Sequence, residues 1–509
     1  MNASRARNDQ PKKIVVVGGG TAGWMAAAAL VKFLGRTVDV TLVESDAIGI
    51  VGVGEATIPQ IRNLNQALEI DEAEFVAGTN GSFKLGIEFV NWRALGHSYF
   101  HNFSKIGLAV NQVQFHHHLF RAQAEGIGGA LWDYCVNTQA ARGGRFAPMD
   151  TLGSSRLAGI GHAYHFDAAL YGRFLRRYAE AHGAERVEGR IIDVHQDAET
   201  GDVTAVRLEG DRSVEGEIFI DCSGFRGLLI DGALNTGYED WSRWLRCDSA
   251  LAVPSRNTRP PRPYTQAIAH DAGWQWRIPL QHRTGNGHVF SSAYTDADAA
   301  RETLLANLEG EALAEPRLIN FTTGRRTKFW NRNVVALGLA SGFLEPLEST
   351  SIHLVQSGIS RFIQMFPARP VYEAERDEYN DQTAIEFERI RDFLILHYHL
   401  NERTDSRFWI DVREMDVPDT LRRKLDLFKG SGRIYRAPHD LFTEDSWLQV
   451  MHGQGLTPQT WHPLADKLSS AELQDMLANI RQIVTNAAAR LPAHGDFVSG
   501  CCAAPDAAQ

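Results

Sequence analysis

The hydrophobic and polar positions near the start of the chain predict a strand, a tight turn and a helix. Four β-forming residues at 14–17 precede a run of small or apolar residues at 25–31. Three glycines lie between these two segments: Gly18, Gly20 and Gly23. A second apolar run at 38–43 ends in Glu44. Strand, glycine turn, helix and strand in this order predict an α/β unit.

The pattern further along the chain keeps alternating between helix and strand. Residues 165–182 have apolar side chains at a spacing of four and are followed by Gly183, which predicts a helix with a glycine stop. Short strands are predicted next, at 190–194, 203–208 and 217–221. An apolar strand that ends at Leu337 leads into a turn and a helix start around residues 345–351.

Beyond residue 370 the apolar spacing is helical. Two apolar faces are predicted, one formed by Phe387, Ile390, Leu394 and Tyr398 and one by Leu473, Met476, Ile480 and Val484. Ser469 and Glu472 form a capping box before the second of these helices. The tail from Leu491 is rich in small residues, and we predict that it is disordered.

The length of 509 residues exceeds that of a single hydrophobic core and predicts at least two structural units. We place an α/β domain at 1–370, with insertions near 60–150 and 245–330. A mainly helical region at 371–509 is expected to pack against it.

Composition and charge exclude several classes of function. The chain is 44% hydrophobic and 22% charged, as in an ordinary globular protein. Its net charge of −10 leaves no basic excess for nucleic acid and gives no attraction to an anionic membrane. The uncharged segment 14–31 reaches the lower edge of membrane-spanning length, but its glycines and alanines favour the α/β unit.

Cysteine and histidine positions give no sign of a metal site. The five cysteines are odd in number and lack metal-type spacing, which favours a reduced cytoplasm. Three consecutive histidines, His116, His117 and His118, would point apart on a helix or a strand, so they do not form a ligand set.

The glycine-rich turn has the spacing of a dinucleotide fingerprint. Gly18 permits the turn, Gly20 lets the backbone approach a pyrophosphate, and Gly23 allows close strand–helix contact. The helix start offers N–H donors to phosphates, and Glu44, 21 positions after Gly23, can accept both ribose hydroxyls. A glycine turn in an ordinary α/β unit is the alternative.

Several polar or aromatic residues in apolar surroundings are candidates for chemistry. Lys84 lies in the largely apolar segment 81–92. Burial there would cost desolvation unless the lysine is paired with another group or takes part in the chemistry; the alternative is a lysine whose amine reaches the surface. His101 and Phe103 are two positions apart and would share a face of a strand, lining an aromatic pocket or the core. Trp274 and Trp276 alternate in the same way and form either a rigid wall or a core pair.

Two loops are candidates for contacts with a cofactor or an anion. Residues 50–59, which include Ala56, have small side chains suited to a flat cofactor or form a plain loop. At residues 345–351 a helix should begin, and its N–H groups could bind an anion, whereas Glu348 could simply complement the helix dipole. The segment 221–227, DCSGFRG, has the pattern with which two-dinucleotide-fold flavoproteins pass their cofactor again.

Taken together, these motifs resemble the flavin-dependent tryptophan halogenases. The resemblance spans most of the chain: GGGTAG at 18–23, the lysine segment at Lys84, DCSGFRG, WxWxIP at 274–279 and FLEPLEST at 343–350. It implies a Rossmann-like α/β flavoprotein of the flavin monooxygenase type with two dinucleotide-binding motifs and an added C-terminal helical substrate-side subdomain. In that family FADH2 from a separate reductase reacts with oxygen to a C4a-hydroperoxide, and chloride or bromide attacks it to give hypohalous acid.

The resemblance assigns roles to individual residues. Lys84 would hydrogen-bond the oxidant or be halogenated by it, and Glu348 would stabilise and deprotonate the ring cation. His101 and Phe103 would flank an aromatic substrate, while Trp274 and Trp276 would separate the flavin from it. The FAD site would include Gly18, Gly20, Thr21, Ala22, Gly23, Glu44, Ala56, Leu339 and Ser349. Thr350 and Ser351 would bind the halide through backbone N–H groups.

The chain departs from the family pattern at two places. Ser351 stands where a glycine usually follows the threonine of the halide site. Tryptophan-specific members hold the amino acid with a tandem tyrosine, but only Tyr435 occurs between Phe428 and Gln454. We therefore expect indole or another electron-rich aromatic as substrate in place of free tryptophan.

Two other functions remain open from the sequence. A flavin-dependent aromatic hydroxylase would oxidise a nicotinamide cofactor itself and insert oxygen. A non-catalytic flavin-binding protein would have Lys84 and Glu348 far from any cavity. For the halogenase we expect a flavin reductase as a transient partner, no nucleic acid or membrane, and we allow for a homodimer.

Overall fold

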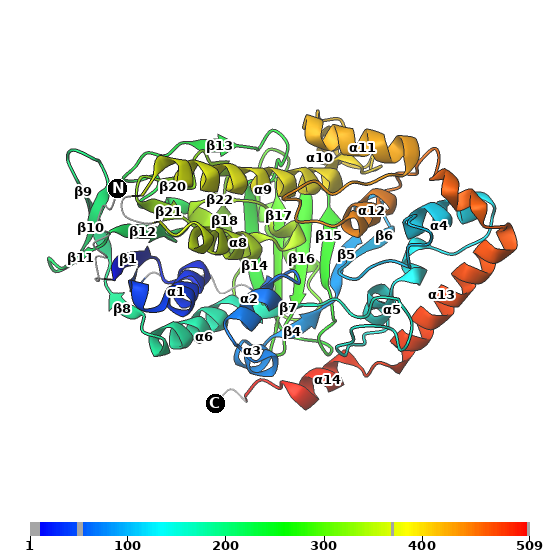
Figure 1. Cartoon of the computed structure of the whole chain (residues 1–509), viewed down its shortest axis with the longest axis horizontal. Helices are drawn as coiled ribbons and strands as arrows, with labels where there is room; N and C mark the ends of the chain where they lie inside the picture. Colours follow the sequence, from blue (N-terminus) through cyan, green and yellow to red (C-terminus); the bar gives the residue numbers. More distant parts are fainter. Residues whose placement is uncertain (1–10, 48–53, 368–370, 506–509) are drawn as a thin grey trace, which may run out of the picture.

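A computed structural model describes residues 11–47, 54–367 and 371–505 of the chain. The protein contains two large sheets that lie side by side, with helices around them and a helical region at one end (Figure 1). No helix within the described ranges is long and apolar enough to cross a membrane. In the same ranges, no group of three or more His, Cys, Asp or Glu side chains is placed to hold a metal ion.

The first sheet has six strands in the order β20-β21-β12-β1-β2-β8. Its centre is parallel: β1 (Lys12–Val17) pairs with β2 (Val38–Glu44) on one side and with β12 (Ile218–Asp221) on the other. The outer strands are β8 (Glu185–Glu188), β21 (Val334–Ala336) and the antiparallel β20 (Trp330–Asn331). This is the α/β fold with a central parallel sheet that the sequence predicted.

Alternate residues of β1 enter different hydrophobic clusters, because side chains of a strand point to opposite faces. Ile14 and Val16 pack with α1 (Thr21–Leu34). Val15 and Val17 pack with a three-stranded antiparallel sheet on the other face. That small sheet consists of β9 (Ile191–Gln196), β10 (Val203–Leu208) and β11 (Ser213–Glu215).

The second large sheet has seven strands in the order β18-β14-β17-β16-β15-β5-β6. Its strands are β5 (Gly86–Val90), β6 (Ser98–Asn102), β14 (Ser249–Ser255), β15 (Thr265–His270), β16 (Gly273–Pro279), β17 (Thr284–Phe290) and β18 (Arg317–Asn320). Beside it, β7 (Ala163–Asp167) pairs with β3 (Gly54–Ala56) and β4 (Ser82–Lys84). Trp274, Trp276 and His101 thus belong to the second sheet.

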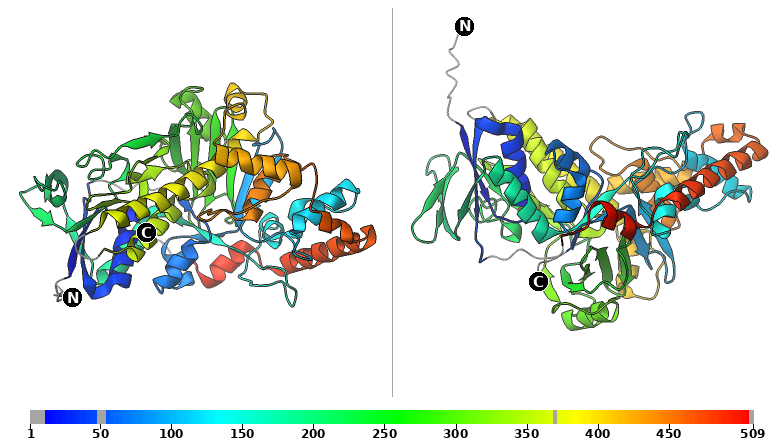
Figure 2. Two further views of the ribbon diagram at one scale, coloured as in Figure 1. Left: turned by 45° about the horizontal axis from the view of Figure 1, so that its top comes forward. Right: turned by 90° about the horizontal axis from the view of Figure 1, so that it is seen from below.

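The long helix α9 (Glu373–His399) crosses from the first sheet to the end that carries the C-terminal helices (Figures 1 and 2). The helices at that end include α4 (Phe115–Ala124), α5 (Val136–Arg142), α10 (Arg407–Arg413), α11 (Asp419–Ser431), α12 (Glu444–Gly453) and α13 (Ser470–Arg490). The predicted apolar face of α9 is buried, and Ser469 caps α13 with Glu472 as expected. One hydrophobic cluster extends from β1 to the C-terminal residues, while the division at residue 370 stays a prediction.

Two predictions from the pattern are wrong in detail. The segment 165–182 is not one helix: its first residues belong to β7, and α6 (Ala168–Ala181) begins where Asp167 caps the backbone N–H groups of Ala169 and Leu170. Over its described residues, 491–505, the tail is not disordered. It forms α14 (His494–Cys501), because His494 and Val498 find a buried contact surface beside β4.

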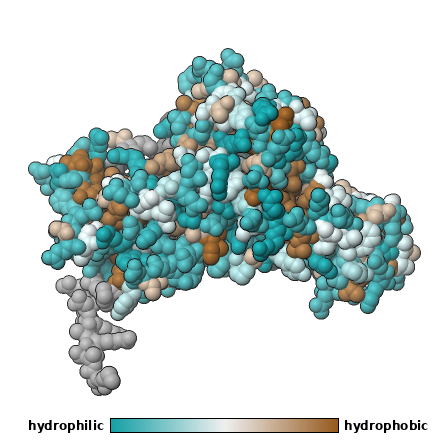
Figure 3. Space-filling model, turned by 90° about the horizontal axis from the view of Figure 1, so that it is seen from above, coloured by the Kyte–Doolittle hydropathy of each residue, from teal (hydrophilic) through white to brown (hydrophobic). Residues whose placement is uncertain are grey.

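The other helices of the described residues are α2 (Ile61–Ala67), α3 (Glu72–Gly78), α7 (Ala297–Ala306) and α8 (Ser351–Gln364). Of these, α7 packs on β14 and β17, and α8 packs against α1 and α2. The molecular face in Figure 3 is mostly hydrophilic, with several separate hydrophobic patches.

Candidate active site

The glycine turn forms part of the wall of a cavity of about 530 Å³ that extends from the first sheet to the second. Gly18 has a φ of +109°, and a side chain there would meet the carbonyl oxygen of Cys222. A Cβ at Gly20 would meet nothing within 4 Å, so the backbone is open at this point. The turn therefore has the shape that close approach of a pyrophosphate requires.

Most residues predicted to bind the cofactor line this cavity. They are Gly18, Gly20, Thr21, Ala22, Glu44, Ala56, Leu339 and Ser349. Gly23 does not line it but packs behind the turn, where a Cβ would lie 1.9 Å from the carbonyl oxygen of Gly18. Of the predicted loop 50–59, residues 50–53 lie outside the described residues. The fingerprint, the open backbone at Gly20 and the carboxylate of Glu44 fit a dinucleotide such as FAD.

The cavity is also lined by residues that were only weakly predicted from the sequence to contact a cofactor, or were not predicted at all. Cys222, Ser223, Gly224, Phe225 and Arg226 of the DCSGFRG segment line it, so that motif shares a cavity with the glycine turn. Gly189, Arg190 and Ile191 line the part near Glu44. Glu44 Oε1 also accepts a hydrogen bond from Arg186 Nε over 2.5 Å, a partner that only the pairing of β2 with β8 brings close.

Trp274 and Trp276 on β16 form one wall of the cavity. Both side chains are buried, and their ring centroids lie 6.1 Å apart. The indole N–H of Trp274 donates to Glu345 Oε2 over 3.0 Å, and Tyr398 Oη donates to the same oxygen over 2.5 Å. Burial raises the pKa of Glu345 to about 7, although both of these hydrogen bonds act to lower it. The tryptophan wall is therefore anchored on a buried carboxyl group.

The FLEPLEST segment joins the cavity to a buried polar cluster. Pro346–Glu348 form a single 3-10 turn, and α8 begins at Ser351. Between them Ser349 has a left-handed φ of +58°, an uncommon conformation for a residue other than glycine. This backbone reversal leaves Ser349 at the cavity wall and Glu348 fully buried.

Lys84 lies at the end of β4 and is fully buried. Its Nζ donates a hydrogen bond to Ser349 Oγ over 2.8 Å and lies 5.3 Å from the centroid of the Phe103 ring. Burial lowers the pKa of Lys84 to about 7, while the charge of Glu348 acts in the opposite direction. Lys84 is thus paired and desolvated, unlike the surface lysine that the sequence left open.

Glu348 contacts two histidines, one at each carboxylate oxygen. His101 Nδ1 on β6 lies 2.7 Å from Oε2, and His397 Nε2 on α9 lies 2.7 Å from Oε1. Burial by itself would raise the pKa of Glu348, but the charge and hydrogen bond of His101 and the contact with His397 lower it to about 2. The carboxylate is therefore held ionised inside the protein.

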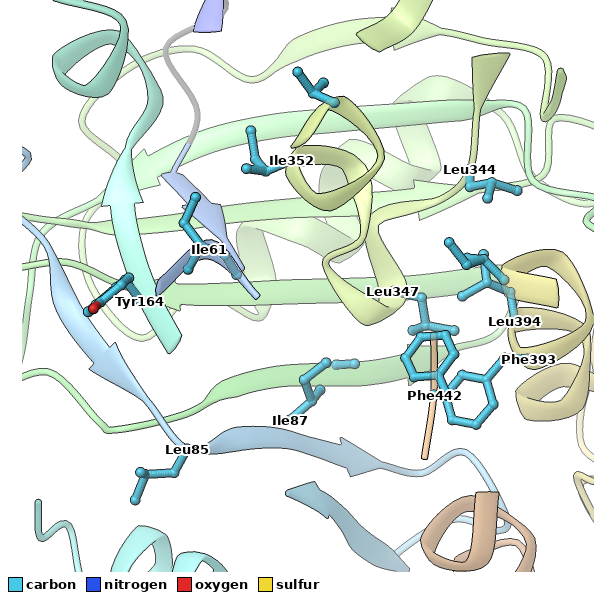
Figure 4. Close-up of a cluster of buried hydrophobic side chains, with 14 of the residues drawn as sticks. Ile61, Leu85, Ile87, Tyr164, Leu344, Leu347, Ile352, Phe393, Leu394 and Phe442 are labelled. Carbon is cyan, nitrogen blue, oxygen red and sulfur yellow. The ribbon is translucent and has the colours of Figure 1, made fainter. Parts of the chain in front are cut away.

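The side of Glu348 away from the cavity is aromatic. The ring centroid of His101 lies 6.2 Å from that of Phe103 and 5.6 Å from that of Phe393. Phe393 stacks on Phe442 at 3.8 Å, and Figure 4 shows these two rings gathered beside Leu347. The tertiary structure thus brings together the predicted pair His101 and Phe103 with apolar residues of the C-terminal helical region.

The predicted halide residues lie at the start of α8. Thr350 is buried, and its Oγ1 has no hydrogen-bond partner among the described residues. Ser351 is the first residue of the helix and lines the cavity. A buried hydroxyl without a partner beside helical N–H groups fits a small anion.

Comparisons with known proteins agree with this geometry. A family model described as "Tryptophan halogenase" matches residues 13–470. The chain belongs to the tryptophan halogenase family. It is 34% identical over 487 residues to a tryptophan 6-halogenase, SttH from Streptomyces toxytricini, covering 90% of this chain and 92% of that protein.

Two solved flavin-dependent halogenases are more similar in sequence. Xcc4156 from Xanthomonas campestris is 50% identical with a TM-score of 0.94, covering 97% of this chain and 99% of its own. BrvH from Brevundimonas sp. BAL3 is 45% identical with a TM-score of 0.94, covering 98% and 100%. The protein is therefore a flavin-dependent halogenase, and this class is supported over the aromatic hydroxylase.

The geometry also argues against a non-catalytic flavin-binding protein. Lys84 and Glu348 were expected far from any cavity in that case. Both are buried next to Ser349, which lines the cavity.

His397 is not among the site residues predicted from the sequence. Its neighbours on α9 were predicted only to form an apolar face. The signal that could have found it is one histidine within the apolar run of residues 393–398, where an ionisable side chain needs a partner.

Proposed function

We propose that this halogenase uses FADH2 from a separate flavin reductase, oxygen, and chloride or bromide to halogenate indole or another electron-rich aromatic. Bound reduced flavin supplies hypohalous acid from oxygen and halide. The observation that carries the proposal is the hydrogen bond from buried Lys84 to Ser349, which connects the cofactor cavity to the aromatic side of the site.

Lys84 receives the oxidant on the side of Ser349 away from the flavin. A pKa of about 7 leaves a substantial fraction of its side chain as the neutral amine near neutral pH. The ammonium form can donate a hydrogen bond to hypohalous acid. The neutral form can accept the halogen instead: an N–halogen bond forms, the O–halogen bond breaks, and the amine proton leaves with the hydroxide as water. Either form presents an electrophilic halogen to an aromatic ring beside Phe103.

Glu348 stabilises the ring cation and removes its proton. Its ionised carboxylate places a negative charge where positive charge develops in the transition state. After halogen addition, the proton of the attacked ring carbon passes to a Glu348 oxygen and the ring regains aromaticity. A carboxylate is a sufficient base because the cation is a strong acid.

The other predicted residues divide the site into compartments. Trp274 and Trp276 keep the aromatic substrate away from the flavin, so that ring hydroxylation does not compete. Thr350 and Ser351 hold the halide at the start of α8. His101 and Phe103 flank the ring of the substrate.

The substrate proposal rests on the side chains around Phe442 and Phe393. These contribute apolar aromatic surface next to His101, which suits an uncharged ring. With no tandem tyrosine between Phe428 and Gln454, we propose indole or a related ring before free tryptophan. The five free cysteines are consistent with a reduced cytoplasm.

The test is incubation of the protein with FAD, a flavin reductase, bromide and a panel of indoles, phenols and pyrroles. Mass spectrometry should detect halogenated product. Lys84→Ala should abolish that product while oxygen consumption continues, and Lys105→Ala, at an exposed lysine, should leave it unchanged. Absence of product across the panel, or full activity of Lys84→Ala, would overturn the proposal.

A further inference from the structure

His397 contacts the oxygen of Glu348 that His101 does not reach. Its Nε2 lies 2.7 Å from Glu348 Oε1, while His101 Nδ1 lies 2.7 Å from Oε2. His397 and Glu348 are both fully buried, and His101 is 2% exposed. The carboxylate is thus clamped from two elements, β6 and α9, that are far apart in the sequence.

Tyr99 completes this arrangement behind His397. Tyr99 Oη lies within hydrogen-bond distance of His397 Nδ1, at 2.9 Å, and Tyr99 is fully buried. In the tautomer that suits a carboxylate at one nitrogen and a hydroxyl donor at the other, Nε2 carries the proton and Nδ1 accepts from Tyr99. Tyr99, His397 and Glu348 therefore form a row in which each member orients the next.

Aromatic packing fixes the plane of the His397 ring. Phe89 stacks on His397 at 4.5 Å and on Tyr99 at 5.0 Å. Trp92 and Phe393 meet the same imidazole edge-on, at 6.0 Å and 5.3 Å. With its ring held on several sides, His397 cannot turn its Nε2 away without repacking the core.

We infer that His397, oriented by Tyr99, is the positioning residue of Glu348: it holds Oε1 and so fixes the plane of the carboxylate, whose Oε2 lies beside His101 on the side of the substrate ring. This inference rests on the proposed function of Glu348 as the base. His397 touches neither substrate nor flavin in this role. It acts only through Glu348.

The role has an electrostatic part as well as a geometric one. The titratable groups that interact with Glu348 are Lys84 on β4, His101 and Tyr99 on β6, and His397 on α9. Burial acts to raise the pKa of Glu348, and the His397 contact is one of the effects that hold it low. Loss of that contact should raise the pKa and leave Glu348 protonated at a higher pH than in the wild type.

The experiment measures coupling, defined as halogenated product formed per oxygen consumed, at about pH 7. Oxygen consumption measures the reaction of the flavin, whereas coupling measures how efficiently the halogenation step follows it. His397→Phe keeps a ring but removes the imidazole nitrogen that lies 2.7 Å from Glu348 Oε1, so its coupling at neutral pH should fall by about 10- to 100-fold, the loss of one close polar contact to a charged group.

Three further variants separate this role from a structural one. Tyr99→Phe removes only a hydroxyl and should lower coupling in the same direction by a smaller factor. His397→Gln retains an N–H donor and should keep more coupling than His397→Phe. His399→Phe makes the same exchange two positions along α9, at a side chain that the structure does not place against Glu348, and should behave as the wild type.

The outcomes discriminate between the two proposals. Wild-type protein that makes no halogenated product contradicts the proposed function. Product in the wild type together with unchanged coupling in His397→Phe and Tyr99→Phe overturns the role of His397. Equal coupling in His397→Gln and His397→Phe also overturns it. If His397→Phe fails to fold, the coupling of Tyr99→Phe and His397→Gln decides in the same way.

Discussion

Lys84 and Ser349 lie 265 positions apart in the chain, and the Nζ of one donates to the Oγ of the other over 2.8 Å. Ser349 lines the cofactor cavity, while Lys84 is fully buried behind it. In the proposed function, the hydroxyl of Ser349 is therefore the point at which the flavin side meets the halogenation side.

Lys84 should make the stability of the protein depend on pH. Burial lowers its folded-state pKa from 10.5 to about 7, so between these values the unfolded chain binds more protons than the folded protein. The contribution of Lys84 to stability therefore rises with pH across this window. Lys84→Met removes the buried charge, and its Tm should exceed that of the wild type by more at about pH 6 than at about pH 9. A Tm difference that is constant over this range would contradict the shifted pKa.

Gly287 should control the position of the tryptophan wall. A Cβ at this residue would lie 2.1 Å from Trp276 Cζ2, within the indole ring. Gly287→Ala should push Trp276 from its place and weaken FAD binding by about tenfold, since overpacking of this kind costs about 1–3 kcal/mol. Titration of the flavin by fluorescence measures this effect. Gly430→Ala, where a Cβ meets nothing within 4 Å, is the control and should bind FAD as the wild type does.

Thr350 should contribute to halide binding more than to stability. Its buried Oγ1 has no hydrogen-bond partner among the described residues, so replacing the hydroxyl with a methyl group removes a desolvation cost. Thr350→Val should keep or raise the Tm while it raises the KM for bromide by about tenfold, the loss of roughly one hydrogen bond to an anion. An unchanged KM would exclude the hydroxyl from the halide site and leave only the backbone N–H groups.

His494 should support the strand that carries Lys84. Its Nε2 accepts the N–H of Phe83 over 3.2 Å, and its Nδ1 donates to the carbonyl of Pro261 over 2.7 Å. Burial lowers the pKa of His494 to about 4, so it is neutral in its folded environment. His494→Ala should lower the free energy of unfolding by about 1–3 kcal/mol, because it leaves a buried N–H and a carbonyl unpaired. A disordered tail would instead tolerate this change without loss, and denaturant unfolding separates the two cases.

The local helices, strands and turns could be predicted because the residues that determine each of them lie within a short stretch of sequence. The strand at 14–17, the glycine turn and the first helix are encoded by β-forming residues, Gly18 and small apolar side chains, and all are present. The capping box of Ser469 and Glu472 is equally local. The boundary near His165 was wrong, since whether that segment is strand or helix depends on pairing with β3 and β4.

The sequence predicted which residues belong to the candidate site, but not how they are arranged in space. The motifs around Lys84, Trp274 and Glu348 indicated the halogenase class, which the comparisons support. They could not show that Glu345 anchors Trp274 or that His397 contacts Glu348. Such contacts join residues far apart in the chain, and no periodicity or spacing encodes them.

The sequence by itself determined the elements, the cofactor fingerprint and the candidate chemical groups, because these follow from backbone preference and side-chain type over short stretches. Tertiary structure alone decided which groups share an environment. It buried Lys84 so that its pKa falls, placed a histidine at each oxygen of Glu348 so that the carboxylate stays charged, and packed α14 beside β4. The physical reason is that desolvation and charge pairing depend on what lies within a few ångströms in space, whatever the separation along the chain.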